Sequence, residues 1–130
     1  MPRALALILL PALVLGGCSR QDAKLEQHAK ALSSLTATTA AIGDAWLAGF
    51  VSGTYADTAL ERTLQLVEAE RQTLGGASYL LIDPRGARLS RQAERVSRAL
   101  ALMVKSVRDS DAGGLRREMS EAVSAGDGSR

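Results

Sequence analysis

Apolar and small side chains recur at intervals of three and four residues along much of the chain, the spacing of one face of an α-helix. The first stripe of this kind predicts a helix over residues 21–50, about 45 Å long at 1.5 Å per residue. The middle of this segment is rich in Ser, Thr and Ala, which suits close approach of neighbouring helices. The stripe consists of Leu25, His28, Leu32, Leu35, Thr39, Ile42 and Trp46.

The sequence GFVSGTY, residues 49–55, interrupts this pattern. Its two glycines weaken the helix, and Thr54 followed by Asp57 resembles an N-terminal capping box. A second helix is expected from Thr54 to about Leu74, where the following glycine pair should end it. Its inner face is expected at Leu60, Thr63, Leu64, Val67 and Leu74. An alternative is that the glycines only kink one very long helix.

A connector, ASYLLIDPRG, follows over residues 77–86. Leu80, Leu81 and Ile82 are expected to plug one end of the core, and the Asp83-Pro84 pair opens a turn or the next helix. A third helix is predicted over residues 87–110, ended by Gly113-Gly114. A short fourth helical segment, residues 115–125, precedes a polar tail over residues 126–130.

These elements predict an all-α protein, an antiparallel helical bundle of three main helices plus a short C-terminal helix. The alternative is a helical hairpin that completes its core by self-association. Only 3% of the 130 residues are aromatic, while Ala and Leu, both strong helix formers, supply most of the apolar content. The single cysteine excludes an internal disulfide and any multi-cysteine metal site, and neither a metal nor another cofactor is expected.

The N-terminus has the three parts of a secretory signal. Arg3 supplies a positive start, residues 4–15 form an apolar run of 12 residues, and two glycines follow. Twelve residues make about 18 Å of helix, less than the roughly 20 residues that a membrane span needs. The motif Leu15-Gly16-Gly17-Cys18 then resembles the lipobox of bacterial lipoproteins.

This resemblance implies that the signal is cut before Cys18, whose thiol is diacylated and anchors the protein to a membrane. It divides the chain into a signal peptide over residues 1–17, a helical domain over residues 18–125 anchored at Cys18, and the polar tail. Ser19 resembles the default residue for sorting to the cell outer membrane, facing the periplasm, in a Gram-negative host. A Gram-positive host would place the protein, with its palmitate-type anchor, on the outer face of the plasma membrane.

Charge is concentrated in the third predicted helix, where residues 85–108 hold seven basic side chains and one acidic one. At helical spacing the basic residues occupy one side and the apolar residues the other, so the basic side faces solvent or a partner. We call the following five residues the basic face: Arg88, Arg91, Arg95, Arg98 and Lys105. The opposite side consists of Leu89, Val96, Leu100, Met103 and Val107.

Two interpretations of the basic face stay open. In the first it is solvated or neutralised internally: Glu94 bridges Arg91 and Arg98, and acidic residues of the second helix meet its flank. Those acidic residues are Asp57, Glu61 and Glu68. In the second it binds an anionic partner, which for a lipid-anchored protein means lipid headgroups, an acidic envelope polymer or an acidic protein. Nucleic acid is not expected, because export removes it from reach and no aromatic residues interleave the arginines.

The residues available for catalysis are few. His28 is the only histidine, and its place in an apolar stripe favours a partly buried structural role. Trp46, Phe50 and Tyr55 are expected to pack in the core, with an exposed partner-binding cluster as the alternative. The sequence therefore predicts a non-enzymatic, lipid-anchored envelope protein for protein–protein interaction or self-association. The alternative is a peripheral binder of anionic membrane or envelope polymer through the basic face.

Overall fold

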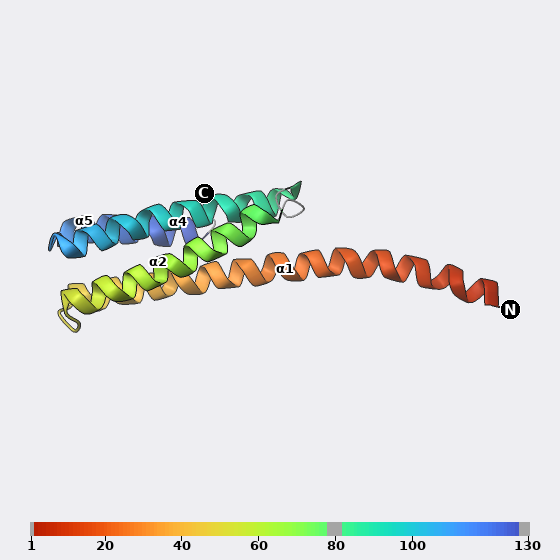
Figure 1. The fold of residues 1–130 in the computed structure, drawn as a ribbon, viewed down its shortest axis with the longest axis horizontal. Helices are drawn as coiled ribbons and strands as arrows, with labels where there is room; N and C mark the ends of the chain where they lie inside the picture. The colour runs from red at the N-terminus through yellow and green to blue at the C-terminus, as the bar shows by residue number, and fades with distance from the viewer. Residues whose placement is uncertain (1, 78–81, 128–130) are drawn as a thin grey trace.

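The computed structural model describes residues 2–77 and 82–127, with side chains from residue 20 onward. Within these residues it contains helices and no strands, and successive helices run antiparallel (Figure 1). The helices are α1 (Pro2–Leu47), α2 (Gly53–Gly76), α4 (Pro84–Arg108) and α5 (Ala112–Gly126). The prediction of an all-α antiparallel bundle with a short last helix is confirmed.

The four helices form a ring. α2 packs along α4, α4 packs along α5, and α1 closes the ring by packing on α2 and α5. α1 and α4 are diagonal to each other and touch more lightly. The N-terminal part of α1 continues past the ends of the other helices (Figure 1). None of the helices combines the length and apolar character of a membrane span over the described residues.

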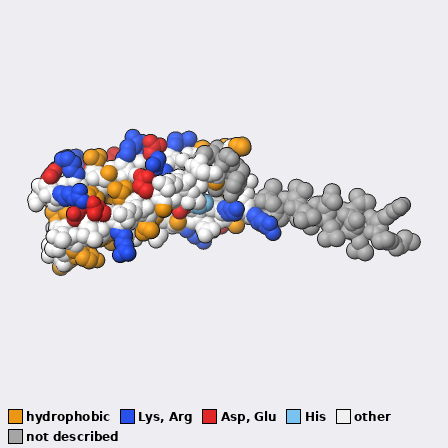
Figure 2. Space-filling model, in the orientation of Figure 1, with side chains coloured by type: hydrophobic (Ala, Val, Ile, Leu, Met, Phe, Trp, Pro, Cys, Tyr) orange, Lys and Arg blue, Asp and Glu red, His pale blue; other side chains and the backbone are white. Residues whose placement is uncertain are grey.

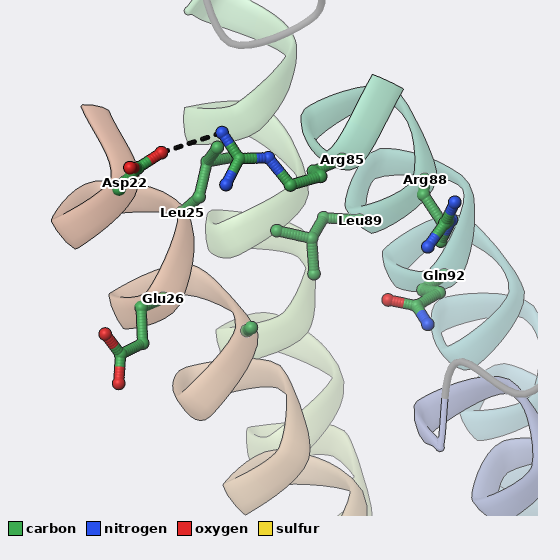
Figure 3. A pocket seen from close by; sticks show the side chains of 8 residues that line it. Asp22, Leu25, Glu26, Arg85, Arg88, Leu89 and Gln92 are labelled. Carbon is green, nitrogen blue, oxygen red and sulfur yellow. Dashed lines mark hydrogen bonds and ion pairs between the residues drawn. The ribbon is translucent and has the colours of Figure 1, made fainter. Parts of the chain in front are cut away.

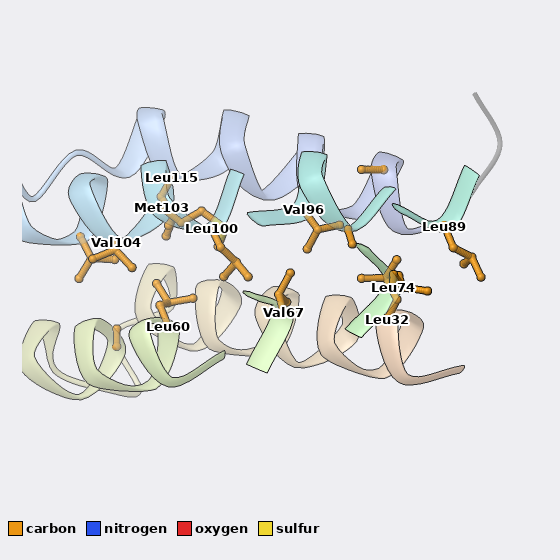
Figure 4. Packing of buried hydrophobic residues seen from close by; sticks show 14 of the residues in the cluster. Leu32, Leu60, Val67, Leu74, Leu89, Val96, Leu100, Met103, Val104 and Leu115 are labelled. Carbon is orange, nitrogen blue, oxygen red and sulfur yellow. The ribbon is translucent and has the colours of Figure 1, made fainter. Parts of the chain in front are cut away.

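α4 supplies the largest share of the core, because it lies against three other helices. Twelve of its 25 residues are buried, including all five apolar residues expected on its inner side. They meet leucines and a valine of the other helices in one continuous cluster (Figure 4). The predicted inner face of α2 is confirmed, except that Leu64 is only partly buried. The fully buried large side chains include Leu32, Leu60, Val67, Leu74, Val96, Leu100, Met103 and Leu115.

The turn between α1 and α2 differs in detail from the prediction. α1 already ends at Leu47, and Gly49 has a φ of 77°, a left-handed conformation that glycine adopts without steric cost. The N-cap of α2 is Ser52 and not Thr54, since the Ser52 hydroxyl accepts a 3.1 Å hydrogen bond from the backbone N–H of Tyr55. Because the chain reverses direction here, the alternative of one long kinked helix is wrong.

The connector before α4 was predicted less well. Leu80 and Leu81 lie outside the described residues, and Ile82 is 84% exposed, so its predicted role as a core plug is wrong. Asp83 caps α4 by accepting a 2.9 Å hydrogen bond from the backbone N–H of Arg85. Pro84 takes the first helical position, where a missing N–H costs nothing. The Asp-Pro pair therefore opens a helix, three residues earlier than the expected start at residue 87.

The junction of α4 and α5 requires a second correction. Gly113 and Gly114 do not end the third helix but lie in the first turn of α5. α4 ends at Arg108, and the Asp111 carboxylate caps α5 by accepting a 2.8 Å hydrogen bond from the Gly114 N–H. A Cβ atom at Gly114 would lie only 2.8 Å from the Ser106 hydroxyl, so this glycine permits the two helices to approach closely.

Candidate functional site

The basic face points outward, as the sequence predicted, for four of its five residues. Arg88, Arg91, Arg98 and Lys105 are exposed, and Arg95 is half-buried beside α5. Basic side chains, interspersed with acidic ones, line the edge of the molecule formed by α4 and α5 (Figure 2). One member of the face, Arg88, also lines a groove that α4 shares with α1, the helix that carries Cys18.

Three of the basic-face residues have acidic neighbours. Arg98 lies 3.5 Å from Glu94 one helical turn earlier. Lys105 donates a 2.7 Å hydrogen bond to Asp109, which raises the pKa of its ammonium group. Arg95 lies 3.7 Å from Glu121 of α5. These are exposed or half-exposed pairs, which contribute little to stability because water screens their charges.

Arg88 and Arg91 are different, because neither forms an ion pair or hydrogen bond with another side chain among the described residues. The expected bridge from Glu94 to both neighbours forms only with Arg98. Two guanidinium groups near the start of α4 are therefore available to an external anion.

The acidic residues of α2 neutralise only one edge of α4. The Arg108 Nε donates a 3.0 Å hydrogen bond to Asp57, and Glu61 also accepts from the guanidinium, so the pKa of Arg108 is raised. Glu68 instead accepts a hydrogen bond from the Ser97 hydroxyl and pairs with Arg71 on its own helix. These interactions lower the pKa of the Glu68 carboxyl, with the Ser97 hydrogen bond as the largest cause.

A groove lies between α1 and α4 at the end of the bundle nearest Cys18 (Figure 3). Its volume is about 500 Å³. It exists because α5 has 15 residues whereas α4 has 25, so none of the described helices covers the last part of the α1–α4 seam. We call it the open-end groove; it is lined by Asp22, Leu25, Glu26 and Ala29 of α1 and by Arg85, Arg88, Leu89 and Gln92 of α4.

The residues that line the two walls of the open-end groove have the same spacing along their helices. Each contributes residues at positions i, i+3, i+4 and i+7, one face of two helical turns. The same side of α1, further along, seats α5: a Cβ atom at Gly126 would lie 2.6 Å from the Thr36 hydroxyl, and one at Gly43 would lie 2.7 Å from the Met119 sulfur. The groove is therefore the continuation of the seat that α5 occupies.

Charges line both rims of the groove. Arg85 of α4 reaches across to Asp22 of α1 with a 2.7 Å hydrogen bond, and it also pairs with Asp83 (Figure 3). These contacts lower the pKa of the Asp83 carboxyl and raise the pKa of the Arg85 guanidinium. Glu26 lies on the outer rim, 3.2 Å from Lys30 on the same helix. The groove thus has acidic groups on its α1 wall and arginines on its α4 wall.

His28 is a boundary residue, as predicted, and the structure adds its partner. Its Nδ1 atom forms a hydrogen bond with Glu70 of α2, and both side chains are about five-sixths buried. The pair connects two helices at the seam of the open end, which is a structural role. Among the described residues there is no group of three His, Cys, Asp or Glu side chains that could hold a metal ion.

A second groove, of about 420 Å³, lies between α1 and α2. Tyr55 and Leu66, which are 60% and 54% exposed, line it together with Ile42 and Arg62. Phe50, in the nearby turn, is 85% exposed, and Trp46 is partly buried against the core. The expectation of core packing for the three aromatic residues is therefore correct for Trp46 and wrong for Phe50 and Tyr55.

Sequence reasoning identified the basic face but missed the open-end groove. The spacing of its wall residues is visible in the sequence, yet the same spacing describes any helix side. The one signal that could have pointed to it is the shortness of the fourth helical segment relative to the third. Cys18 lies within the backbone of α1, but its side chain is outside the described residues, so lipid attachment stays a prediction.

No family model, curated protein or solved structure matches this chain. The fold and the geometry of its surfaces are therefore the basis for a functional proposal.

Proposed function

We propose that this chain is a non-enzymatic, lipid-anchored module of the bacterial cell envelope that binds another envelope protein. Two features support this proposal. The lipobox-like motif ending at Cys18 supplies a membrane anchor, and the bundle has an uncovered helix seat directly beyond it. The uncovered seat is the observation that carries the proposal.

An uncovered helix seat favours a protein as the ligand. A groove between two helices commonly receives an amphipathic helix from a partner, whose apolar side packs on the groove floor. Leu25 of α1 and Leu89 of α4 line the open-end groove from its two walls (Figure 3). Polar and charged groups at the rims can then fix the orientation of the guest.

The location of the groove fits an anchored protein. Asp22 lies four residues after Cys18, or about 6 Å along an unbroken helix. A lipid on Cys18 would hold the groove within a few ångströms of the membrane surface. The natural partner is then an envelope protein with a segment at the membrane surface.

In-cell photo-crosslinking tests the proposal. A photo-reactive amino acid at the exposed groove position Ala29 should capture a distinct protein, which mass spectrometry identifies. The same probe at Gln65, an exposed residue of α2 outside the grooves, should capture it far less efficiently. Capture of no protein from the groove position, in cells that express the chain normally, would contradict the proposal.

The anchor has its own test. Replacing Cys18 with Ser should abolish metabolic labelling of the chain by palmitate and release it from the membrane fraction. Persistent labelling of the variant would show that the lipobox interpretation is wrong. The capture experiment at Ala29 is independent of this result, because it reports on the groove.

A second candidate function is binding of an acidic envelope polymer through the basic face. Among the described residues Arg88 and Arg91 form no ion pair, which favours this candidate.

Charge reversal tests this second candidate. The double variant Arg91→Glu/Arg98→Glu should lose at least about tenfold in affinity for soluble polyglutamate, and the loss should shrink at high salt. The matched control is Arg116→Glu/Arg117→Glu, which makes the same change in net charge on exposed positions of α5. Equal loss in both variants would show non-specific attraction and contradict the assignment.

A further inference from the structure

We infer that the open-end groove binds an amphipathic helix of a partner protein that runs antiparallel to α1 and α4, with acidic residues on its flank toward α4 and basic residues on its flank toward α1. This inference rests on the proposed function, because it describes the partner of that same groove. It specifies the direction of the guest helix and the sign of the charge on each flank.

The direction follows from the bundle itself. α1 and α4 run in the same direction, and α5 runs against both of them (Figure 1). The groove continues the seat of α5 along the same sides of the two wall helices, at the same three-and-four spacing. A guest that packs there repeats the geometry of α5 and therefore also runs antiparallel to the walls.

The acidic flank follows from a contact that α5 already makes. Glu121 of α5 lies 3.7 Å from Arg95 of α4. Arg88 is seven residues before Arg95, so it occupies the equivalent position two turns closer to Cys18. It has no acidic partner among the described residues, and a carboxylate on a guest helix would complete the pattern without displacing an existing pair.

The basic flank follows from the opposite wall. Asp22 and Glu26 lie one turn apart on α1 and face the same groove. Asp22 is engaged by Arg85, whereas the one ion pair of Glu26 in the described part of the chain is with Lys30, an exposed pair within its own helix. Such a pair contributes little, so a Lys or Arg of the guest can compete for Glu26. The two open rim positions, Arg88 and Glu26, therefore have opposite charge.

The floor of the groove shows why charge must give the specificity. Leu25 and Leu89 are only 4% and 9% exposed, because α1 and α4 already approach each other there. A guest helix gains limited new apolar contact from them, mainly at Ala29 and along the stems of the arginines. Its affinity should accordingly fall when salt is added, more steeply than for a purely apolar contact.

Synthetic peptides test the assignment on the full lipidated chain in nanodiscs, with empty nanodiscs as the blank. The probe is a 15-residue helix with a Leu stripe, Glu on one flank and Lys on the other. The control peptide has the same Leu stripe, with Gln replacing every charged residue. Fluorescence anisotropy should show that the charged peptide binds at least about tenfold more tightly at low salt.

Variants of the chain locate the binding. Arg88→Glu should weaken the charged peptide at least about tenfold and leave the neutral peptide within about twofold. The matched control, Arg98→Glu, makes the same charge change on an exposed residue of α4 outside the groove and should change neither affinity. Because Arg88 is exposed and has no ion-pair partner within residues 20–77 and 82–127, thermal unfolding of the variant should match that of the parent chain, which excludes misfolding as the cause.

The direction is read from a photo-reactive group at the C-terminus of the charged peptide, which should crosslink to residues 20–26 or 84–88. Crosslinks at the α5 side of the groove, equal binding of the two peptides, or equal loss with Arg98→Glu would each overturn the inference. Dimerisation of the chain alone that Arg88→Glu abolishes would also overturn it, since the occupant would be a second copy. Peptide binding as expected, with no protein captured in cells from Ala29, would instead remove only the proposed function.

Discussion

The bundle has two halves, which differ in whether α5 covers the seam between α1 and α4. In the closed half, α5 packs along α4 and on α1, and its Glu121 reaches Arg95 of α4, so the core is enclosed by four helices. In the open half, residues of α1 within 22–29 and of α4 within 85–92 line the open-end groove. The closed half contains the small residues that allow close packing, whereas the open half has charged rims.

This difference indicates that the two halves of the fold have different roles. Gly43, Gly114 and Gly126 each stand where a Cβ atom would meet a neighbouring side chain at less than 3 Å, so the closed half is fitted around α5. The open half differs in its polar contacts. It has charged residues on two rims and an ion pair, Asp22–Arg85, that ties its walls together. The closed half provides stability and the open half provides a surface.

The largest effect on stability is expected when a core leucine is replaced with alanine in either half of the bundle. Leu115 of α5 is fully buried, so Leu115→Ala should lower the free energy of unfolding by about 2–5 kcal/mol. Leu89→Ala, at the floor of the groove, should fall at the low end of that range, because solvent and flexible rim side chains can relax into the space. Urea denaturation measures both. Equal losses would mean that the two halves are packed alike.

Gly126→Ala should separate the end of α5 from α1. The new Cβ atom would lie 2.6 Å from the Thr36 hydroxyl, so the last turn of α5 must shift, at a cost of about 1–3 kcal/mol. Gly75→Ala is the control, because nothing lies within 4 Å of that position and alanine favours a helix. Hydrogen exchange should show faster exchange at the end of α5 in the first variant only. Unchanged protection there would contradict the close fit.

The His28–Glu70 contact tests how much a polar pair contributes to the open half. Removing either partner should cost about 0.5–2 kcal/mol, since the two side chains are mostly buried and bonded to each other. A double-mutant cycle with His28→Ala and Glu70→Gln separates the pair from the packing of each residue. Strictly additive losses would show that the two side chains do not stabilise each other.

The smallest effect concerns the Glu68–Ser97 contact between α2 and α4. The pKa of Glu68 is lowered in the folded state, mainly by the Ser97 hydrogen bond and further by Arg71. Ionised Glu68 therefore stabilises the fold above its unfolded pKa of about 4.5, and this stabilisation is lost as the pH falls through the lower folded value. Ser97→Ala should raise the pKa of Glu68 toward 4.5, as followed by NMR titration. The same titration curve in both proteins would disprove the cause.

Much of the fold could be predicted because it depends on local spacing. The three-and-four stripes located α2 and α4 to within a few residues, and the amphipathic pattern of α4 correctly divided its buried and exposed sides. Errors occurred where a residue has two possible roles. Ser52 and Thr54 are both capable N-caps, and Gly113-Gly114 can end one helix or begin the next. The choice depends on where the neighbouring helix packs.

The candidate site was predicted only in part for the same reason. The outward direction of Arg88, Arg91, Arg98 and Lys105 follows from one helix alone, and the sequence gives it directly. The partners of His28, Glu68 and Arg108 lie 29 to 51 residues away and depend on how the helices are arranged. The open-end groove needs α1 and α4 to be brought together, which no local pattern encodes.

The sequence by itself determined the helical class, the approximate helix boundaries, the basic face and the expectation of a lipid anchor at Cys18. These follow from the periodicity, composition and motifs of short segments. Only the tertiary structure decided that α1 and α4 are diagonal, that α5 covers one half of their seam, and that the other half is a charged groove. The physical reason is that an amphipathic stripe shows that a side chain will be buried, but the choice of neighbouring helix depends on how all four helices pack together.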